Sequence, residues 1–134
     1  MRHYAEEWLV VRLAGMVGPG LRKNPVYDIL HDLPLRIHPD SRYQFMATDD
    51  AARASLALLS GGSRRETYNV CGDGLVSPRD IAAMAGRSLN LSTAGPTMEP
   101  RVVNINLAKT SGLVPLSATE PTLRSFVEKE IAPR

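Results

Sequence analysis

A glycine-rich loop that follows an apolar run is the segment of this sequence with the most chemical potential. Residues 8–13 read Trp-Leu-Val-Val-Arg-Leu, and residues 15–20 then have the spacing G-x-x-G-x-G. A dinucleotide-binding fingerprint needs three glycines that open directly into an apolar helix, with an acidic residue about 20 positions later. Here Pro19 lies inside the loop and polar residues delay the helix. We therefore interpret the loop as a strand exit that needs positive φ angles, rather than as a phosphate cradle.

The other side chains that could do chemistry are scattered. Asp49 and Asp50 are adjacent at the start of an alanine-rich segment, where a helix cap and a first-turn acid are expected more often than catalysis. Cys71 is the only cysteine, so no internal disulfide forms, and no His or Lys lies beside it in sequence to activate the thiol. We expect it to be a small buried residue. The three histidines lack metal-ligand spacing, so we predict no metal site and no catalytic residue in this chain.

Length and composition indicate an ordinary globular protein. A chain of 134 residues suits one domain, which we place at residues 1–134, and 43% hydrophobic with 22% charged residues is typical of a folded chain. A formal net charge of +2, with dispersed basic residues, gives no indication of nucleic acid or of a membrane surface as a partner. No apolar run is long enough for a membrane span or an export signal, so we expect a cytoplasmic protein.

The order of predicted elements indicates a mixed α/β fold. Residues 8–13 are almost continuously apolar, as in a parallel strand covered on both faces. Asn24-Pro25 and Ser77-Pro78 are typical helix starts. The pattern also predicts a hairpin of strands at 35–38 and 43–47, a helix at 50–59 capped by Thr48 or Asp49, a strand at 67–70, an edge strand at 102–105, a short helix capped by Asn106, and a last helix at 121–131.

Four blocks in order resemble the C-terminal portion of the extended short-chain dehydrogenases/reductases, the NAD-dependent epimerase/dehydratase family. The block from Arg12 to Pro19 resembles the family's Arg-Pro-x-Asn-x-Tyr-Gly-Pro segment. Residues 44–52 resemble Phe-Ile-His-Val-Asp-Asp-x-Ala, and residues 68–72 resemble Tyr-Asn-Val-Gly-Gly. Residues 101–109 resemble Arg-x-x-Asp-x-x-x-x-x-x-Lys in part. The family's glycine-rich cofactor loop and its Tyr-x-x-x-Lys pair are missing from this sequence.

The resemblance implies both a fold and a set of site residues. The fold is the α/β substrate-binding lobe, with the last strands of a Rossmann-type sheet and without the N-terminal nucleotide-binding half. Arg101 is either a grip on a diphosphate or an ordinary solvent-exposed arginine, and the sequence favours neither. The positions implied to line the nicotinamide end of the cofactor are Leu13, Ala14, Gly15 and Met16, and those implied to contact substrate are Gly15, Phe45 and Arg101.

Two hypotheses of function follow from the resemblance. The first is a truncated or split NAD(P)-dependent nucleotide-sugar epimerase/dehydratase lobe, which is inactive alone and uses NAD or NADP only when an N-terminal half completes it. The second is a stand-alone, non-catalytic ligand-binding or protein-interaction module derived from that lobe. In both cases the apolar strand at residues 8–13 must be covered. We therefore expect either a homo-oligomer or the N-terminal half as a partner, with a nucleotide sugar as the candidate ligand.

Overall fold

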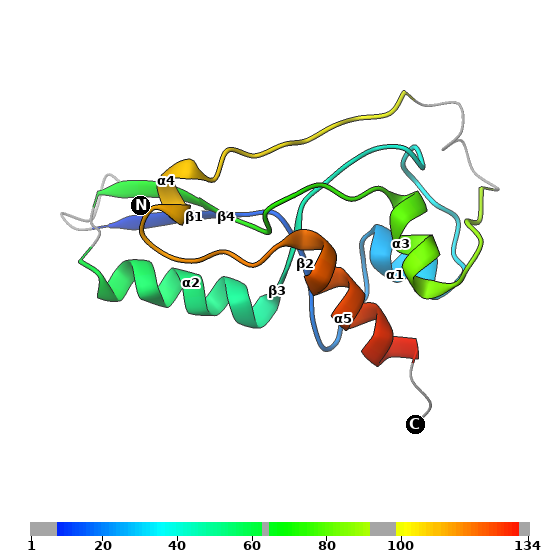
Figure 1. Ribbon diagram of the computed structural model, residues 1–134, viewed down its shortest axis with the longest axis horizontal. Helices are drawn as coiled ribbons and strands as arrows, with labels where there is room; N and C mark the ends of the chain where they lie inside the picture. Colours follow the sequence, from blue (N-terminus) through cyan, green and yellow to red (C-terminus); the bar gives the residue numbers. More distant parts are fainter. Residues whose placement is uncertain (1–7, 63–64, 92–98, 132–134) are drawn as a thin grey trace.

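The computed structural model describes residues 8–62, 65–91 and 99–131 as a mixed α/β fold (Figure 1). Its strands are short and all their pairings are parallel. β1 (Leu9–Leu13) pairs with β4 (Glu66–Val70), and β2 (Gly15–Val17) pairs with β3 (Phe45–Ala47). The helices are α1 (Pro25–Leu30), α2 (Thr48–Ser60), α3 (Pro78–Ala85), α4 (Ala108–Ser111) and α5 (Thr119–Ile131).

β1 and β2 together form one nearly continuous strand that changes partner at Ala14. The first half pairs with β4, and the second half pairs with β3. The predicted loop at 15–20 therefore begins later than expected, because residues 15–17 still pair as a strand. The predicted burial of residues 8–13 on both faces is also wrong for the end of the strand, since Arg12 and Leu13 are exposed.

Two clusters of buried side chains form the core. In the first, α1, α3 and α5 pack around the β2–β3 pair, with Phe45, Ile81 and Leu123 among the buried residues. In the second, α2 covers the β1–β4 pair through Ala51, Ala54 and Leu58. In Figure 1, α2 lies on one side of this pair of strands and α4 on the other.

The starts of two helices, α1 and α3, lie where the sequence predicts them. The side chain of Asn24 accepts a hydrogen bond from the backbone N–H of Tyr27, and Pro25 is the first residue of α1. Ser77 and Asp80 form a reciprocal capping box at the start of α3. Each cap satisfies donors that the first helical turn leaves free, which is why these starts are readable from sequence.

The predicted hairpin at 35–38 and 43–47 is wrong. Residues 35–38 form no strand, and the N–H of Leu35 donates to the carbonyl of Asn90 instead. Tyr43 exchanges two backbone hydrogen bonds of 2.9 Å with Val76. The partners of this segment therefore come from distant parts of the chain. The alternation of apolar and polar residues at 35–38 does not produce a strand, and such alternation cannot show which segment pairs with a strand.

Three further expectations need correction. The helix predicted at 50–59 begins at Thr48, and no side chain caps it, because β3 runs directly into α2 through Ala47. Asp49 and Asp50 nevertheless lie in its first turn, where negative charge is favourable. The predicted edge strand at 102–105 is reduced to a single bridge between Val102 and Arg42. The residue at the N-cap of α4 is Leu107, not Asn106 as predicted. The side chain of Asn106 nevertheless accepts a hydrogen bond of 2.9 Å from the N–H of Ala108, the first residue of α4.

Gly72 lies where the chain after β4 packs directly against the backbone of Phe45. A Cβ atom at this position would collide with the backbone carbonyl oxygen of Phe45 and would lie 2.6 Å from the hydroxyl of Thr119. Backbone cannot move aside as a flexible side chain can. We expect Gly72→Ala to lower the free energy of unfolding by roughly 3 kcal/mol, the upper part of the range for overpacking. Urea denaturation of this variant and of Gly61→Ala, where the nearest atom lies 3.2 Å away, measures the difference. Equal stability of the two variants would contradict this contact.

Candidate functional site

The four positions predicted to line a cofactor lie along the junction of β1 and β2. Leu13 is 48% exposed, and Ala14, Gly15 and Met16 are half-buried. The carbonyl of Met16 accepts a hydrogen bond of 3.0 Å from the side-chain amide of Asn24. This segment therefore presents one exposed side chain and a stretch of extended backbone to its surroundings.

Asn24 holds this segment in place from the far end of the loop. Its φ of 117° and ψ of 172° lie in a region that is used almost only by glycine. The conformation persists because its amide donates to Met16 while its carbonyl oxygens accept from Tyr27 and Asp28. The strained residue thus ties the end of β2 to the start of α1.

Gly15 and Phe45 are brought together as register partners of β2 and β3. A Cβ atom on Gly15 would lie 2.7 Å from the ring of Phe45, so glycine is needed for the ring to pack there. Phe45 is 3% exposed and belongs to the core cluster. Its ring is therefore covered in the described structure, and its role toward a substrate stays a prediction.

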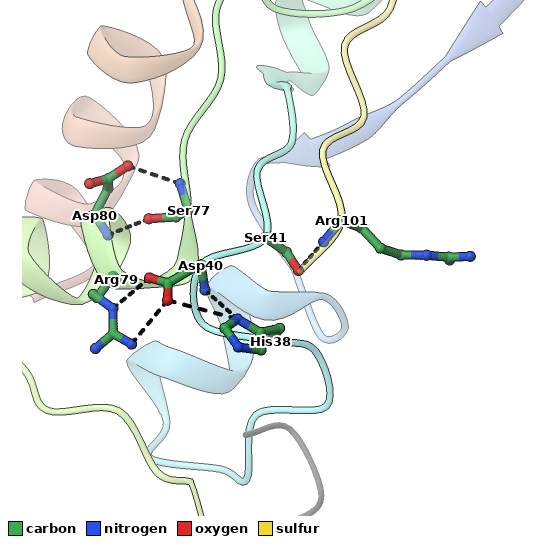
Figure 2. A network of polar contacts seen from close by, with 7 residues as sticks. All are labelled: His38, Asp40, Ser41, Ser77, Arg79, Asp80 and Arg101. Atoms are coloured by element: carbon green, nitrogen blue, oxygen red, sulfur yellow. Dashed lines mark hydrogen bonds and ion pairs between the residues drawn. The ribbon is translucent and has the colours of Figure 1, made fainter. Parts of the chain in front are cut away.

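Arg101 lies on an extended segment that runs beside residues 41–44. Its backbone N–H donates to the hydroxyl of Ser41 at 3.0 Å, and its carbonyl accepts from Arg42 at 2.7 Å. Its side chain is exposed and points away from the neighbouring charged residues (Figure 2). Arg42 forms an isolated parallel bridge with Val102, the residue that follows Arg101. The backbone of Arg101 is thus held in place, and its guanidinium is exposed.

A network of charged side chains that the sequence analysis missed lies at the turn before Ser41. The guanidinium of Arg79 binds the carboxylate of Asp40 through Nε at 2.8 Å, and the N–H of Asp40 donates to Nδ1 of His38 at 3.0 Å (Figure 2). The hydrogen bond from Arg79 holds the pKa of the Asp40 carboxyl below its ordinary value. Asp40 and Arg79 are 39 residues apart, so no local spacing could have indicated the pair. The network joins the turn to the start of α3.

The glycine loop after β2 borders a cavity in the described structure. The cavity has a volume of about 450 Å³ and lies between the loop, the start of α2 and α5. Gly18 and Pro19 line it on one side, and Phe126 and Lys129 line it on the other. Neither Phe45 nor Arg101 reaches it. The predicted substrate residues and this cavity are therefore separate features.

The glycines of this loop serve two different purposes. Gly20 has a φ of 81°, as predicted for a strand exit. Gly18 does not have a positive φ, contrary to our expectation, and is needed because a Cβ atom would collide with the side chain of Thr48. The close approach of the loop to the start of α2 explains the residue at this position.

Cys71 is buried in the second core cluster, as predicted. Burial, together with the nearby charge of Asp73, raises the pKa of its thiol above the ordinary value of 9.0. The thiol is therefore protonated at neutral pH and is a poor nucleophile. No cluster of three or more His, Cys, Asp or Glu side chains suited to a metal ion occurs in residues 8–62, 65–91 and 99–131. In the same residues no helix is long and apolar enough to cross a bilayer.

Comparison with known proteins defines the fold. No family model matches the sequence, and no curated protein matches it. Solved structures do match. RMD from Pseudomonas aeruginosa, complexed with NADPH, is 21% identical with a TM-score of 0.69, and 91% of this chain covers 48% of it. UDP-glucuronic acid 4-epimerase from Bacillus cereus, in complex with UDP-glucuronic acid and NAD, is 25% identical with a TM-score of 0.67, and 91% of this chain covers 43% of it.

A third match, dTDP-glucose 4,6-dehydratase from Bacillus anthracis in complex with NAD, has a TM-score of 0.71 at 18% identity, and 90% of this chain covers 43% of it. The chain has the fold of the C-terminal portion of the extended short-chain dehydrogenases/reductases. This confirms the predicted fold class. The chain spans less than half the length of each of these three proteins.

The ion pair between Asp40 and Arg79 should be visible in a pH titration. Because the pKa of Asp40 is lowered in the folded state, the pair stabilises the fold above pH 3.8, and this contribution is lost as pH falls through the lowered pKa. NMR titration of the Asp40 carboxyl should give a pKa below 3.8, and Arg79→Ala should raise it. Arg87→Ala, which removes an exposed arginine elsewhere, should leave it unchanged. An unaltered Asp40 pKa in Arg79→Ala would contradict the assignment.

Proposed function

We propose that this chain is the substrate-side lobe of an NAD- or NADP-dependent nucleotide-sugar epimerase or dehydratase, and that it is inactive until a nucleotide-binding portion completes it. The observation that carries the proposal is the state of β1. Among the described residues it pairs only with β4, in a parallel sheet of two strands. Parallel sheets occur almost only with several strands and helices on both faces. In this proposal the two strands are the edge of a larger sheet, which the nucleotide-binding portion continues beyond β1.

The comparisons support the same conclusion. The three solved proteins described above have this fold as less than half of their chains. Two of them are described in complex with NAD, one with NADPH, and one of these also with UDP-glucuronic acid. We infer that this chain, once completed, likewise binds NAD or NADP together with a nucleotide sugar.

The described residues do not supply a site for the pyrophosphate of a dinucleotide. Such a site needs a helix that starts directly after a glycine-rich turn, so that its N-terminal N–H groups face the phosphates. Here β2 continues to Val17, and α1 starts only at Pro25 behind the side chain of Asn24. The chain's contribution to cofactor binding is thus limited to the strand junction at residues 13–16, next to the nicotinamide end. When bound, the cofactor would supply hydride transfer.

In this proposal each predicted site residue has a distinct role. The backbone at Leu13, Ala14 and Met16 borders the nicotinamide end of the cofactor. Gly15 and Phe45 together shape the substrate side, because the Phe45 ring packs over the bare backbone of Gly15, where any side chain would meet the ring. Arg101 binds the diphosphate, since its exposed guanidinium makes no ion pair with a described acidic residue and a planar fork suits two phosphate oxygens. We propose a cytoplasmic setting for this lobe, because its sequence has one cysteine and can form no internal disulfide.

The isolated chain should neither bind the cofactor tightly nor turn over a nucleotide sugar. We expect calorimetric titration of the chain with NADH and NADPH to show no binding at micromolar concentrations, because the pyrophosphate contacts are missing. Assays with UDP-glucose and either oxidised cofactor should show no product. Micromolar affinity of the lone chain for NADH or NADPH would overturn the proposal.

Arg101 provides a test of the substrate side. UDP-glucose added to the ¹⁵N-labelled chain should shift amide signals near residues 99–105, and Arg101→Ala should abolish these shifts. The substitution should change the free energy of unfolding by only about 0.5 kcal/mol, as for most surface positions. Arg87→Ala is the matched control and should keep the shifts. Identical shifts in wild type and Arg101→Ala would show that Arg101 is an ordinary surface residue.

A further inference from the structure

The α4 segment lies along the edge of β4 that faces away from β1. The ammonium group of Lys109 donates to the backbone carbonyl of Thr67 at 2.9 Å, and the hydroxyl of Thr110 donates to the carbonyl of Asn69 at 2.7 Å. Strand carbonyls lie in the plane of the sheet, so a donor reaches them from an edge and not from a face. Because β1 occupies one edge of β4, α4 closes the other.

Lys109 makes further contacts with the same strand. Its ammonium group forms an ion pair with the carboxylate of Glu66 and lies 4.6 Å from the centre of the Tyr68 ring. An ammonium group has three N–H donors, and the face of an aromatic ring attracts a cation. The contacts of this one side chain therefore extend over three successive residues of β4.

The position of α4 depends on its contacts with the rest of the chain. A helix of four residues is too short to be stable by itself. Leu107 and Val114, which lie on either side of it, are buried in the second core cluster. Between them, Lys109 and Thr110 donate to the backbone of β4. The two apolar residues hold the segment near the sheet, and the two polar side chains fix it against the strand edge.

Without this cover, β4 would be well suited to pairing with another strand. Its sequence, Glu-Thr-Tyr-Asn-Val, contains β-branched and aromatic residues and neither proline nor glycine. A strand edge with free carbonyls is a template for another chain, and natural proteins cover such edges. Here the chain covers the edge of β4 with a segment of its own.

We propose that Lys109 and Thr110 form an edge lock, which keeps α4 on β4 and prevents this strand from pairing with the β4 of a second copy. The edge lock acts in the folded chain without cofactor or substrate, so it goes beyond the proposed function. Loss of both donors releases α4 from the edge. In a solution of the lone chain, the strand available to the opened edge is that of a second copy, and a twofold pairing uses the same edge on both.

The double variant Lys109→Met/Thr110→Val tests the edge lock. Both substitutions keep the approximate size of the side chain and remove the donor group, which matters most at Thr110 because it is 1% exposed. The matched control is Lys129→Met/Thr122→Val on α5, which makes the same changes of charge and composition away from β4. Circular dichroism checks that all the chains are folded.

Two readouts follow the two steps of the proposal. Hydrogen exchange of the amides at 111–114 should be at least about tenfold faster in the double variant, because these amides bond within the α4 segment and open when it leaves the edge. Sedimentation from about 1 to about 500 µM should show that the weight-average mass of the double variant rises to about twice that of wild type. The control should match wild type in both measurements.

Two results would overturn the proposal. Unchanged exchange at 111–114 would show that other contacts hold α4, and faster exchange without added association would show that the edge needs no cover. If the double variant is unfolded, Lys109→Met alone is tested with the same readouts, because the Lys109 side chain is 53% exposed and its replacement leaves the core intact. Cofactor binding by the lone chain bears only on the proposed function, so the two ideas can fail separately.

Discussion

The buried amide of Gln44 holds together the segments on which the rest of the structure depends. Gln44 is 3% exposed, and its Nε2 donates to the carbonyls of Gly72 at 3.0 Å and Ile105 at 3.3 Å. Its Oε1 accepts from the N–H of Ile105 at 2.6 Å. Burying an amide costs free energy unless its hydrogen bonds are made. The fold is therefore stable only when the segments around Gly72 and Ile105 lie next to Gln44. The end of β4, the start of β3 and the extended segment before α4 are fixed at one point.

The same point determines where the two core clusters join. Directly after Gln44, the N–H of Phe45 donates to the hydroxyl of Thr119 at 3.3 Å, which positions the start of α5. Gly72 leaves room for the carbonyl of Phe45, so β4 can end against β3. With β3 placed, Phe45 can pack over Gly15, and the strand junction that carries the predicted cofactor positions acquires its shape. The candidate site is thus a consequence of long-range polar contacts and close backbone packing.

Sequence reasoning predicted the elements whose causes are local. Asn24-Pro25 and the Ser77–Asp80 box mark helix starts because each cap acts within three residues. The pairing of β1 with β4, the bridge between Tyr43 and Val76, and the ion pair between Asp40 and Arg79 join positions far apart, and no local pattern encodes such contacts. The order of the family motifs predicted the fold correctly. The burial of the Phe45 ring could not be predicted, because apolar residues on a strand look alike whether they line a pocket or fill a core.

The environment of Cys71 has a practical consequence for work on this chain. The thiol is buried, its pKa is raised, and it is the only cysteine among the 134 residues. Reagents that require a thiolate at the surface will therefore react slowly with the native protein. A cysteine introduced on the surface can then carry a fluorophore or spin label at a single position, while the original residue remains in the core. Unfolding becomes measurable as well, since exposure of Cys71 would report directly on the opening of the second core cluster.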